Sequence, residues 1–339
     1  MEVTTVDTDS PGQWAGLVAL LEAAHRADTP DRDPVDERAL LAEVSLPVPG
    51  LDTVHRIATV DGEVAGYLVM AFPTVDNRHY ASADITVHPR HRRRGIGSAL
   101  LAEALDRAGG RGRRTLGMGA LESGPWPGTP RRDPAGVRFL AAHGFTLGLR
   151  SINRRADLSA LDYSGIDRRY AESMTASAEY ETIAWHGRVP EELLEPLAVL
   201  RAAFLTQIPL GDFDLEAERI DADRLRAEDD ESLAAGRFRC GVVARRAGDT
   251  AIVATTVIGK AGAAEEIAHQ GMTMVAPEHR GHRLGMRVKI ENLRQLRQHC
   301  PGVRRIDTST ADGNVHMIAI NERLGFRPVD HLVECQRQL

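Results

Sequence analysis

An internal repeat is the feature that most constrains this chain. Residues 85–97, ITVHPRHRRRGIG, align without gaps with residues 273–285, TMVAPEHRGHRLG, and the two share Val, Pro, His, Arg and the final Gly. Further on, FLAAHGF at 139–145 is answered by INERLGF at 320–326. Because both matches occur in the same order at nearly the same separation, they indicate a duplicated structural unit.

Both halves predict the same order of secondary structure. In the first half, periodicity and turn signals predict helices at 10–28 and 34–44, a hairpin at 54–72, a strand at 81–88, a helix at 95–109, a strand at 114–120, a helix at 134–143 and a strand from 145. In the second half, they predict a strand at 179–185, helices at 190–206 and 221–235, a hairpin at 237–259, a strand at 268–276, a helix at 284–298, a strand at 303–309, a helix at 312–323 and a final strand. Each half is therefore expected to form an α/β unit of the α+β type with a mixed sheet.

The chain length and composition agree with two domains. A chain of 339 residues exceeds most single cores. We expect a first domain at 1–157, a linker at 158–176, where the sequence is polar and lacks apolar periodicity, and a second domain at 177–339.

Composition also excludes several classes of function. The net charge of −6 argues against wrapping nucleic acid or an anionic membrane. The three cysteines are scattered and form no metal-binding spacing, so no metal is expected. The N-terminal residues have no signal-peptide pattern, and no apolar run is long enough to span a bilayer, so we expect a cytoplasmic protein.

The basic, glycine-bearing turn at 92–98 predicts an anion site. Gly95 and Gly97 lack a Cβ, so the backbone can approach a ligand closely, and the turn opens a helix whose first N–H groups are unpaired. The charges beside it come from Arg92, Arg93 and Arg94. A solvated basic loop is the alternative, but the register of the arginines with the glycines favours a phosphate-bearing ligand.

Arg92-Arg93-Arg94-Gly95-Ile96-Gly97 resembles the Q/R-x-x-G-x-G/A signature of the GNAT superfamily of acyl-CoA-dependent N-acyltransferases. The resemblance covers most of both halves, so the chain is similar to tandem GNAT proteins of actinomycetes, a group that includes mycothiol synthase. It implies two GNAT folds and acetyl-CoA as acyl donor. It also implies that the backbone of Ile85 and Val87 lines the pantetheine, and that the amides from Arg93 to Ser98 hold the pyrophosphate.

The second half matches this signature less closely. Its turn reads Arg280-Gly281-His282-Arg283-Leu284-Gly285, with Arg283 where the first glycine should stand. Either Arg283 turns outward and leaves the amides free for phosphate, or its side chain blocks the site. By register, Thr273 and Val275 take the places of the two pantetheine-lining residues, and Asn314 begins the family's N-x(10)-G-F pattern beside the CoA thiol.

Catalytic groups are less clearly marked. Many relatives protonate the leaving thiolate with a tyrosine four residues before the Gly of Gly-Phe, where this chain has Leu140 and Asn321. Asn321 can hydrogen-bond a thiolate but is a poor acid. As general bases, Asp84 is the candidate of the first half and Glu266 and His269 those of the second. Each candidate also has a non-catalytic interpretation. Asp84 can be a solvated residue at a strand end, Glu266 a polar loop residue, and His269 a hydrogen-bonded structural imidazole.

The resemblance implies transfer of an acetyl group to a primary amine of a small molecule, such as an amino sugar, an amino acid or a natural product. The long loop at 122–134, which carries Trp126, is the expected source of acceptor specificity. Acetylation of proteins or peptides is one alternative. A non-catalytic CoA sensor or scaffold is another, which the missing tyrosines permit. A homodimer is a further expectation.

Overall fold

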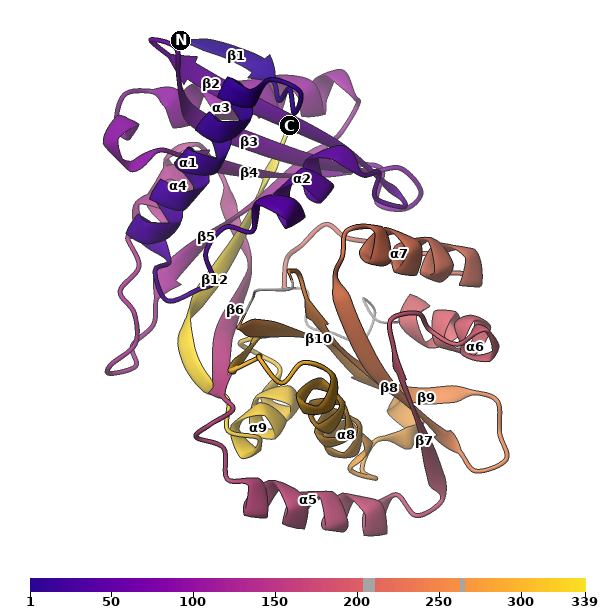
Figure 1. Cartoon of the computed structure of the whole chain (residues 1–339). Helices are drawn as coiled ribbons and strands as arrows, with labels where there is room; N and C mark the ends of the chain where they lie inside the picture. Colours follow the sequence, from indigo (N-terminus) through magenta and orange to yellow (C-terminus); the bar gives the residue numbers. More distant parts are fainter. Residues whose placement is uncertain (204–210, 263–265) are drawn as a thin grey trace. The chain divides into compact units, whose positions relative to one another are not determined.

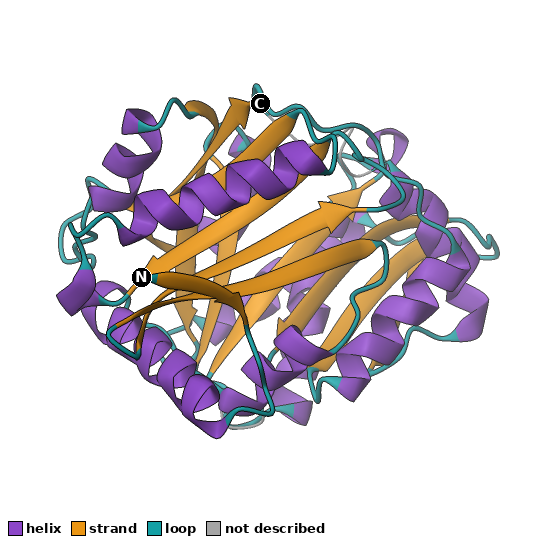
Figure 2. Cartoon of the chain, turned by 90° about the horizontal axis from the view of Figure 1, so that it is seen from above, coloured by secondary structure: helices purple, strands orange, loops and turns teal. Residues whose placement is uncertain are grey.

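The computed structural model describes residues 1–203, 211–262 and 266–339, which form two compact units. The first unit contains residues 1–150, 211–216 and 330–339, and the second contains most of residues 151–329. Each unit is a mixed sheet with helices on its faces, as expected from the sequence (Figures 1 and 2).

The first unit follows the predicted order of elements, with a short additional strand at its start. Its elements are β1 (Glu2–Thr5), α1 (Pro11–Asp28), α2 (Glu37–Ser45), β2 (Leu51–Val60), β3 (Glu63–Pro73), β4 (Tyr80–Val87), α3 (Ile96–Gly110), β5 (Thr115–Ser123) and α4 (Ala135–Ala142). Helix α3 packs closely against β3. A Cβ added to Gly66 of β3 would lie only 2.8 Å from side-chain atoms of Ile96 and Leu100 of α3. One buried core cluster of this unit includes α3 and the sheet, and a second includes α1, α2 and strands β2 and β3.

The second unit repeats this arrangement. Its elements are α5 (Tyr163–Ala176), β7 (Tyr180–His186), α6 (Glu191–Ala202), α7 (Ala222–Ala234), β8 (Phe238–Arg246), β9 (Ile252–Lys260), β10 (Ile267–Val275), α8 (Leu284–His299), β11 (Arg305–Ala311) and α9 (Val315–Arg323). The helix expected at 190–206 corresponds to α6, and positions 204–206 lie outside the described residues.

The final strands of the two halves are exchanged. Strand β12 (Arg327–Gln338) pairs with β5 of the first unit, from Asp330 opposite Ser123 to Gln338 opposite Thr115. Strand β6 (Thr146–Asp157), which closes the first half of the sequence, pairs through its last seven residues with β11 of the second unit. The strand orders are therefore β1-β2-β3-β4-β5-β12 and β6-β11-β10-β9-β8-β7. The two units consequently differ from the contiguous domains 1–157 and 177–339.

The segment 158–176, expected to be a linker, is mostly the helix α5 of the second unit. Asp162 caps this helix by accepting a hydrogen bond from the Gly165 N–H at 2.9 Å. Ile166 is buried in the core of the unit, and the Tyr170 hydroxyl donates to Glu291 of α8. The sequence suggested a linker because only a narrow stripe of α5 is buried, while its other faces carry charged side chains.

Candidate functional site

In both units, two neighbouring parallel strands separate at corresponding places. Strands β10 and β11 pair only from Ile267 opposite Arg305 to His269 opposite Asp307 in the described part of the chain. Strand β10 then has an irregularity between Gln270 and Thr273, where its pairing with β9 shifts register. Its last residues consequently have an edge that is not paired with β11, which leaves backbone groups available to a ligand.

The same separation occurs in the first unit. There, β4 and β5 pair from Tyr80 opposite Thr115 to Ser82 opposite Gly117. Ile85 and Val87 pair with β3 on one side, opposite Leu68 and Gly66. Their β5-facing edge lies beyond the described β4–β5 pairing, which is compatible with the pantetheine-lining role predicted for these two residues.

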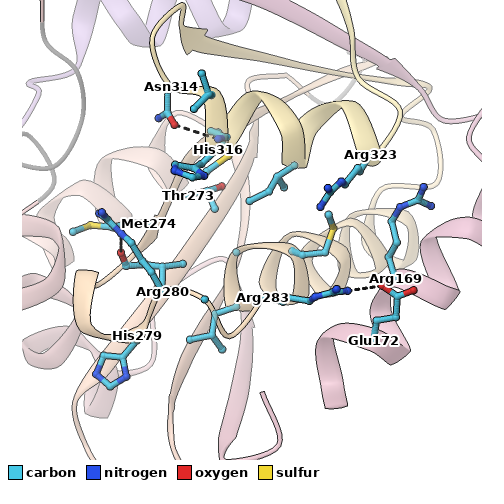
Figure 3. A pocket seen from close by; sticks show the side chains of 18 of the residues that line it. Arg169, Glu172, Thr273, Met274, His279, Arg280, Arg283, Asn314, His316 and Arg323 are labelled. Carbon is cyan, nitrogen blue, oxygen red and sulfur yellow. Dashed lines mark hydrogen bonds and ion pairs between the residues drawn. The ribbon is translucent and has the colours of Figure 1, made fainter. Parts of the chain in front are cut away.

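A pocket of about 920 Å³ lies at the strand separation of the second unit (Figure 3). Strand β10 contributes Thr273, Met274 and Val275, and the turn and first residues of α8 form another wall. The start of α9 supplies the third wall, with Asn314 and His316. The pocket therefore lies where the sequence predicted a ligand for the second half.

Gly285 keeps the inner wall of this pocket open. A Cβ at this position would lie 3.4 Å from Ile320 and 3.6 Å from Val275, so a longer side chain would enter the space between α8, α9 and β10. The matching glycine of the first unit, Gly97, has equivalent neighbours: its Cβ would lie 3.5 Å from Phe139 and 3.8 Å from Val87. The repeat found in the sequence is therefore also a repeat in three dimensions.

Arg283 turns its side chain away from the helix N-terminus. It has φ 56° and forms an ion pair with Glu172 of α5 (Figure 3). The left-handed backbone that glycine adopts at the matching Gly95, with φ 84°, is thus kept at this position by an arginine. Of the two alternatives left open by the sequence, the structure favours the outward side chain.

The charged side chains that line the pocket are mostly cationic. They are Arg168, Arg169, Arg280, Arg283, Arg323 and Glu172. This excess of positive charge is local, because the whole chain has a net charge of −6. The arginines of α5 and α9 were not identified from the sequence, since they lie outside the glycine-bearing turn and are brought to it by the fold. A cationic pocket at a helix N-terminus is suited to a phosphate-bearing ligand.

The leading arginine of each turn has a structural partner. The Arg92 guanidinium donates to both carboxylate oxygens of Asp28, at 2.9 and 2.5 Å, and to the Val87 carbonyl at 3.2 Å. In the second unit, Arg280 donates to the Val275 carbonyl at 3.3 Å. These bonds fasten the turn to its strand, so Arg92 is engaged in the fold and is less available to phosphate than the sequence suggested.

The remaining residues of the two turns are placed as follows. Arg93, at φ 62°, and Arg94 are exposed beside the first helix N-terminus, whereas Ile96 and Leu284 are buried as the first residues of α3 and α8. Ser98 is exposed, with its hydroxyl 3.3 Å from His143 Nε2. Gly281 has φ 87° and lines the pocket, and the His282 ring packs against Tyr180.

Two of the predicted bases lie away from the pocket. Glu266 precedes β10, forms an ion pair with Arg304 at 3.1 Å, and is seven residues from Thr273. At about 3.3 Å per residue this separation is roughly 23 Å. His269 is exposed and four residues from Thr273, about 13 Å along the strand. The fold therefore does not bring either side chain to the strand separation.

Asn314 and Asn321 both have structural roles in α9. The Asn314 side chain accepts from the Met317 N–H at 3.2 Å as the helix cap, and Asn314 also lines the pocket. Asn321 is fully buried, donates to Thr310 at 3.1 Å, and is not a lining residue. This position does not fit a contact between Asn321 and a thiolate.

In the first unit, the charge of Asp84 acts on the Tyr80 hydroxyl of the same strand, β4. The pKa of the Tyr80 hydroxyl is raised, mainly by burial and further by the charges of Glu334 and Asp84. Limited hydration also raises the pKa values of Asp84 and Glu334 themselves. Glu334 lies opposite Gly119 on the exchanged strand β12, so only the fold could show that its charge acts on Tyr80.

The loop at 122–134 is held by buried ion pairs. Arg132 donates to Asp330 at 2.6 Å and to Asp31 at 2.7 Å, with only 2% of its side chain exposed. Trp126 packs against His331, with ring centroids 4.9 Å apart. The loop expected to select the acceptor is thus fixed to β12 of its own unit.

Comparisons with known proteins agree with this arrangement. Residues 17–122 match the model of the acetyltransferase (GNAT) family. A solved tandem GNAT protein from the clavulanic acid biosynthesis pathway is 27% identical, with a TM-score of 0.80, and the match covers 99% of this chain and 98% of that protein. Residues 17–122 therefore belong to the GNAT acetyltransferase family, and the chain as a whole is similar to a tandem GNAT protein. The tandem GNAT organisation predicted from the repeat is thereby confirmed.

More distant and partial matches add to this result. A GCN5-related N-acetyltransferase from Sphaerobacter thermophilus has the same fold, with a TM-score of 0.63 at 15% identity over 99% of this chain and 95% of its own. The mycothiol acetyltransferase of Thermobispora bispora is 33% identical over 43% of this chain and 42% of its own length. That of Nocardia farcinica is 44% identical over 29% and 30%. The chain therefore matches less than half the length of these curated relatives.

Two kinds of feature are absent from the described residues. Within residues 1–203, 211–262 and 266–339, no cluster of three or more His, Cys, Asp or Glu is arranged to hold a metal ion. Within the same ranges, no helix has the length and apolar character needed to cross a membrane.

Proposed function

We propose that this GNAT protein is an acetyl-CoA-dependent N-acetyltransferase that acetylates a primary amine of a small molecule, with acetyl-CoA bound in the second unit. The observation that carries the proposal is the 920 Å³ pocket, where the unpaired edge of β10 meets the N-terminus of α8 among several arginines. Acetyl-CoA has a pyrophosphate for the helix N-terminus and a long pantetheine arm for the strand edge.

The residues of the pocket fit this ligand. Gly285 leaves the space beside the helix N-terminus open, and Arg283 directs its side chain to Glu172 while the backbone amides stay available. Thr273 and Val275 line the same space. Bound acetyl-CoA would supply the activated acetyl group, and the protein would hold it and exclude water.

His316 is a further candidate in this site. It lies in the first turn of α9, lines the pocket and is exposed. An imidazole can accept or donate a proton, which acyl transfer from a thioester to an amine requires. His316 therefore replaces Asn321, Glu266 and His269 as the candidate proton-transfer group of the second unit.

A small-molecule acceptor is supported by the relatives. The curated matches are named mycothiol acetyltransferase, and the tandem GNAT structure comes from a biosynthetic pathway for a small molecule. In the first unit, Gly97 has neighbours equivalent to those of Gly285, and the charges of Asp84 and Glu334 both act on Tyr80. The first unit thus remains a second candidate for acetyl transfer.

Isothermal titration of the full chain with acetyl-CoA tests the donor site. Gly285→Glu should abolish binding in the second unit, because the new carboxylate would enter the pocket and repel phosphate. Gly97→Glu makes the same change in the first unit. Comparison of the two variants therefore shows which unit is responsible for each acetyl-CoA binding event. Gly302→Glu is the matched control, since Gly302 is exposed in a turn with open space around its Cβ position.

Release of free CoA thiol in the presence of a panel of small amines then tests the reaction. Acetyl-CoA-dependent release that requires an amine supports the proposal. Binding that is unaffected by Gly285→Glu would contradict the assignment to the second unit. Absence of acetyl-CoA binding in the unmodified chain would refute the proposed function.

A further inference from the structure

A second, smaller cavity lies in the same unit, and we call it the Trp185 cavity. Its volume is about 170 Å³, and it is bounded by Trp185, residues of α6 and α7, and strands β8 to β10. By the volume of liquid water, about 30 Å³ per molecule, this space corresponds to five or six waters. It therefore suits a compact chemical group better than a complete CoA molecule.

The Trp185 cavity lies on the sheet face opposite α8. Thr255 and Val257 of β9 line the cavity. The residues directly before and after them in the strand, Ala254 and Ile258, belong to the core clusters that contain residues of α8. Because successive side chains of a strand point to opposite faces, the cavity and α8 are on different sides of the sheet.

Strand β10 connects the two cavities. Gly271 and Met272 line the Trp185 cavity, whereas the next residue, Thr273, lines the 920 Å³ pocket. These residues span the irregularity between Gln270 and Thr273. A group in the small cavity would consequently meet the strand at the place where the unpaired edge of β10 begins.

Two polar atoms of the cavity walls have no hydrogen-bond partner among the described residues. They are the indole Nε1 of Trp185 and the hydroxyl of Thr255, and the two residues are only 4% and 0% exposed. A buried polar atom without a partner is destabilising by about 1 to 3 kcal/mol. Two such atoms in one cavity indicate a ligand that completes their hydrogen bonds.

The charged groups of the cavity are already compensated. Arg239 donates to Asp229 at 2.9 Å, and the other carboxylate oxygen of Asp229 accepts from the Val189 N–H at 2.8 Å. Arg201 is paired with Glu228 at 2.7 Å. A charged ligand group would disturb this balance, so a neutral group is favoured. Because an indole N–H only donates, the group must contain an acceptor oxygen.

We propose that the Trp185 cavity is a binding site for a neutral, oxygen-bearing group of the amine substrate, either a hydroxyl or an amide carbonyl, held by Trp185 and Thr255. The inference rests on the proposed acetyl transfer in the second unit. It selects amino alcohols, amino sugars and amino amides as substrates, in preference to simple alkylamines.

The test uses ethanolamine and propylamine, which differ by a hydroxyl in place of a methyl group. The full chain labelled with 5-fluorotryptophan has three tryptophans and should give three ¹⁹F signals, and Trp185→Phe identifies the one from Trp185. Ethanolamine should shift this signal at concentrations where propylamine does not. Thr255→Val keeps the shape of the side chain and should weaken ethanolamine binding about tenfold, as expected for loss of one hydrogen bond.

A steady-state measurement complements the spectroscopic one. In thiol release, Thr255→Val should raise KM for ethanolamine about tenfold and leave KM for propylamine and the acetyl-CoA affinity unchanged. Equal effects of the two amines, equal binding by Thr255→Val, or no shift of the Trp185 signal would overturn the proposal. The spectroscopic part requires no acetyl-CoA, so its outcome is separate from failure of the proposed function.

Discussion

Replacement of Lys289 by methionine should stabilise this protein in a pH-dependent way. Lys289 lies on α8, is only 2% exposed, and has its ammonium group 5.5 Å from the centre of the Phe326 ring. No ion pair connects it to a carboxylate in residues 1–203, 211–262 and 266–339. Burial therefore lowers the pKa of Lys289 from 10.5 to about 7.

The sign and size of the effect follow from this shift. Between pH 7 and 10.5 the unfolded chain binds a proton on Lys289 that the folded chain lacks, so the free energy of unfolding rises with pH. Each pH unit in this window contributes about 1.4 kcal/mol, and the whole shift amounts to about 5 kcal/mol. Below pH 7, the folded protein must hold a buried charge and the destabilisation is complete.

Urea unfolding at pH 6 and pH 8.5 measures this contribution. Lys289→Met removes the charge and keeps a long apolar side chain, so the variant should be several kcal/mol more stable at pH 6. Its advantage should shrink by about 2 kcal/mol at pH 8.5, because part of the pH window has then been crossed. Taking the difference between the two proteins cancels the titration of other groups, including Cys240, whose pKa burial raises to about 12.

Lys260→Met is the matched control, because Lys260 is the only other lysine of the sequence and lies at the end of β9. It should change the stability by less than about 1 kcal/mol, as is usual for surface positions, and equally at both pH values. An advantage of Lys289→Met that is the same at pH 6 and pH 8.5 would refute the reasoning.

Three other predictions concern the fold and the turn of the second unit. A stop after Val329 removes the strand beside β5, so hydrogen exchange should accelerate in β5 of the first unit more than in β10 of the second. Arg132→Met leaves Asp31 and Asp330 without their buried partner and should destabilise the protein by about 3 to 5 kcal/mol in thermal or urea unfolding; a loss below 1 kcal/mol would contradict the role of these ion pairs. Arg283→Gly removes the strain of a left-handed backbone at a non-glycine residue and loses only a half-exposed ion pair. The melting temperature should therefore be unchanged or higher, and the acetyl-CoA affinity measured by titration should change less than threefold.

The sequence was sufficient to predict the repeated unit, its mixed sheet and the glycine-bearing turns between strand and helix. These features have local signals, such as the glycine pair at 95 and 97 and the alternation of apolar residues in the strands. The closing strands β6 and β12 have the same kind of alternation. Nothing in that pattern specifies the unit in which each strand pairs, so the exchange required the structure.

The site was predicted in part. The positions of Thr273, Val275 and Gly285 were correctly placed around one pocket, because the repeat aligned them with the first half. The catalytic candidates Glu266 and His269 were chosen for their chemistry, but strand geometry separates them from the pocket. The arginines of α5 could not be predicted, since a helix with a narrow buried stripe resembles a polar linker in the sequence.

The exchanged strands also determine the order in which this protein can be completed during synthesis. Strand β5 leaves the ribosome about 200 residues before its partner β12, so the sheet of the first unit stays open at one edge until nearly all of the second unit has been made. An open edge can pair with another chain. The sheet of the first unit is therefore completed only after the second half of the chain has been translated. Recombinant expression of residues 1–157 alone should give an aggregation-prone fragment.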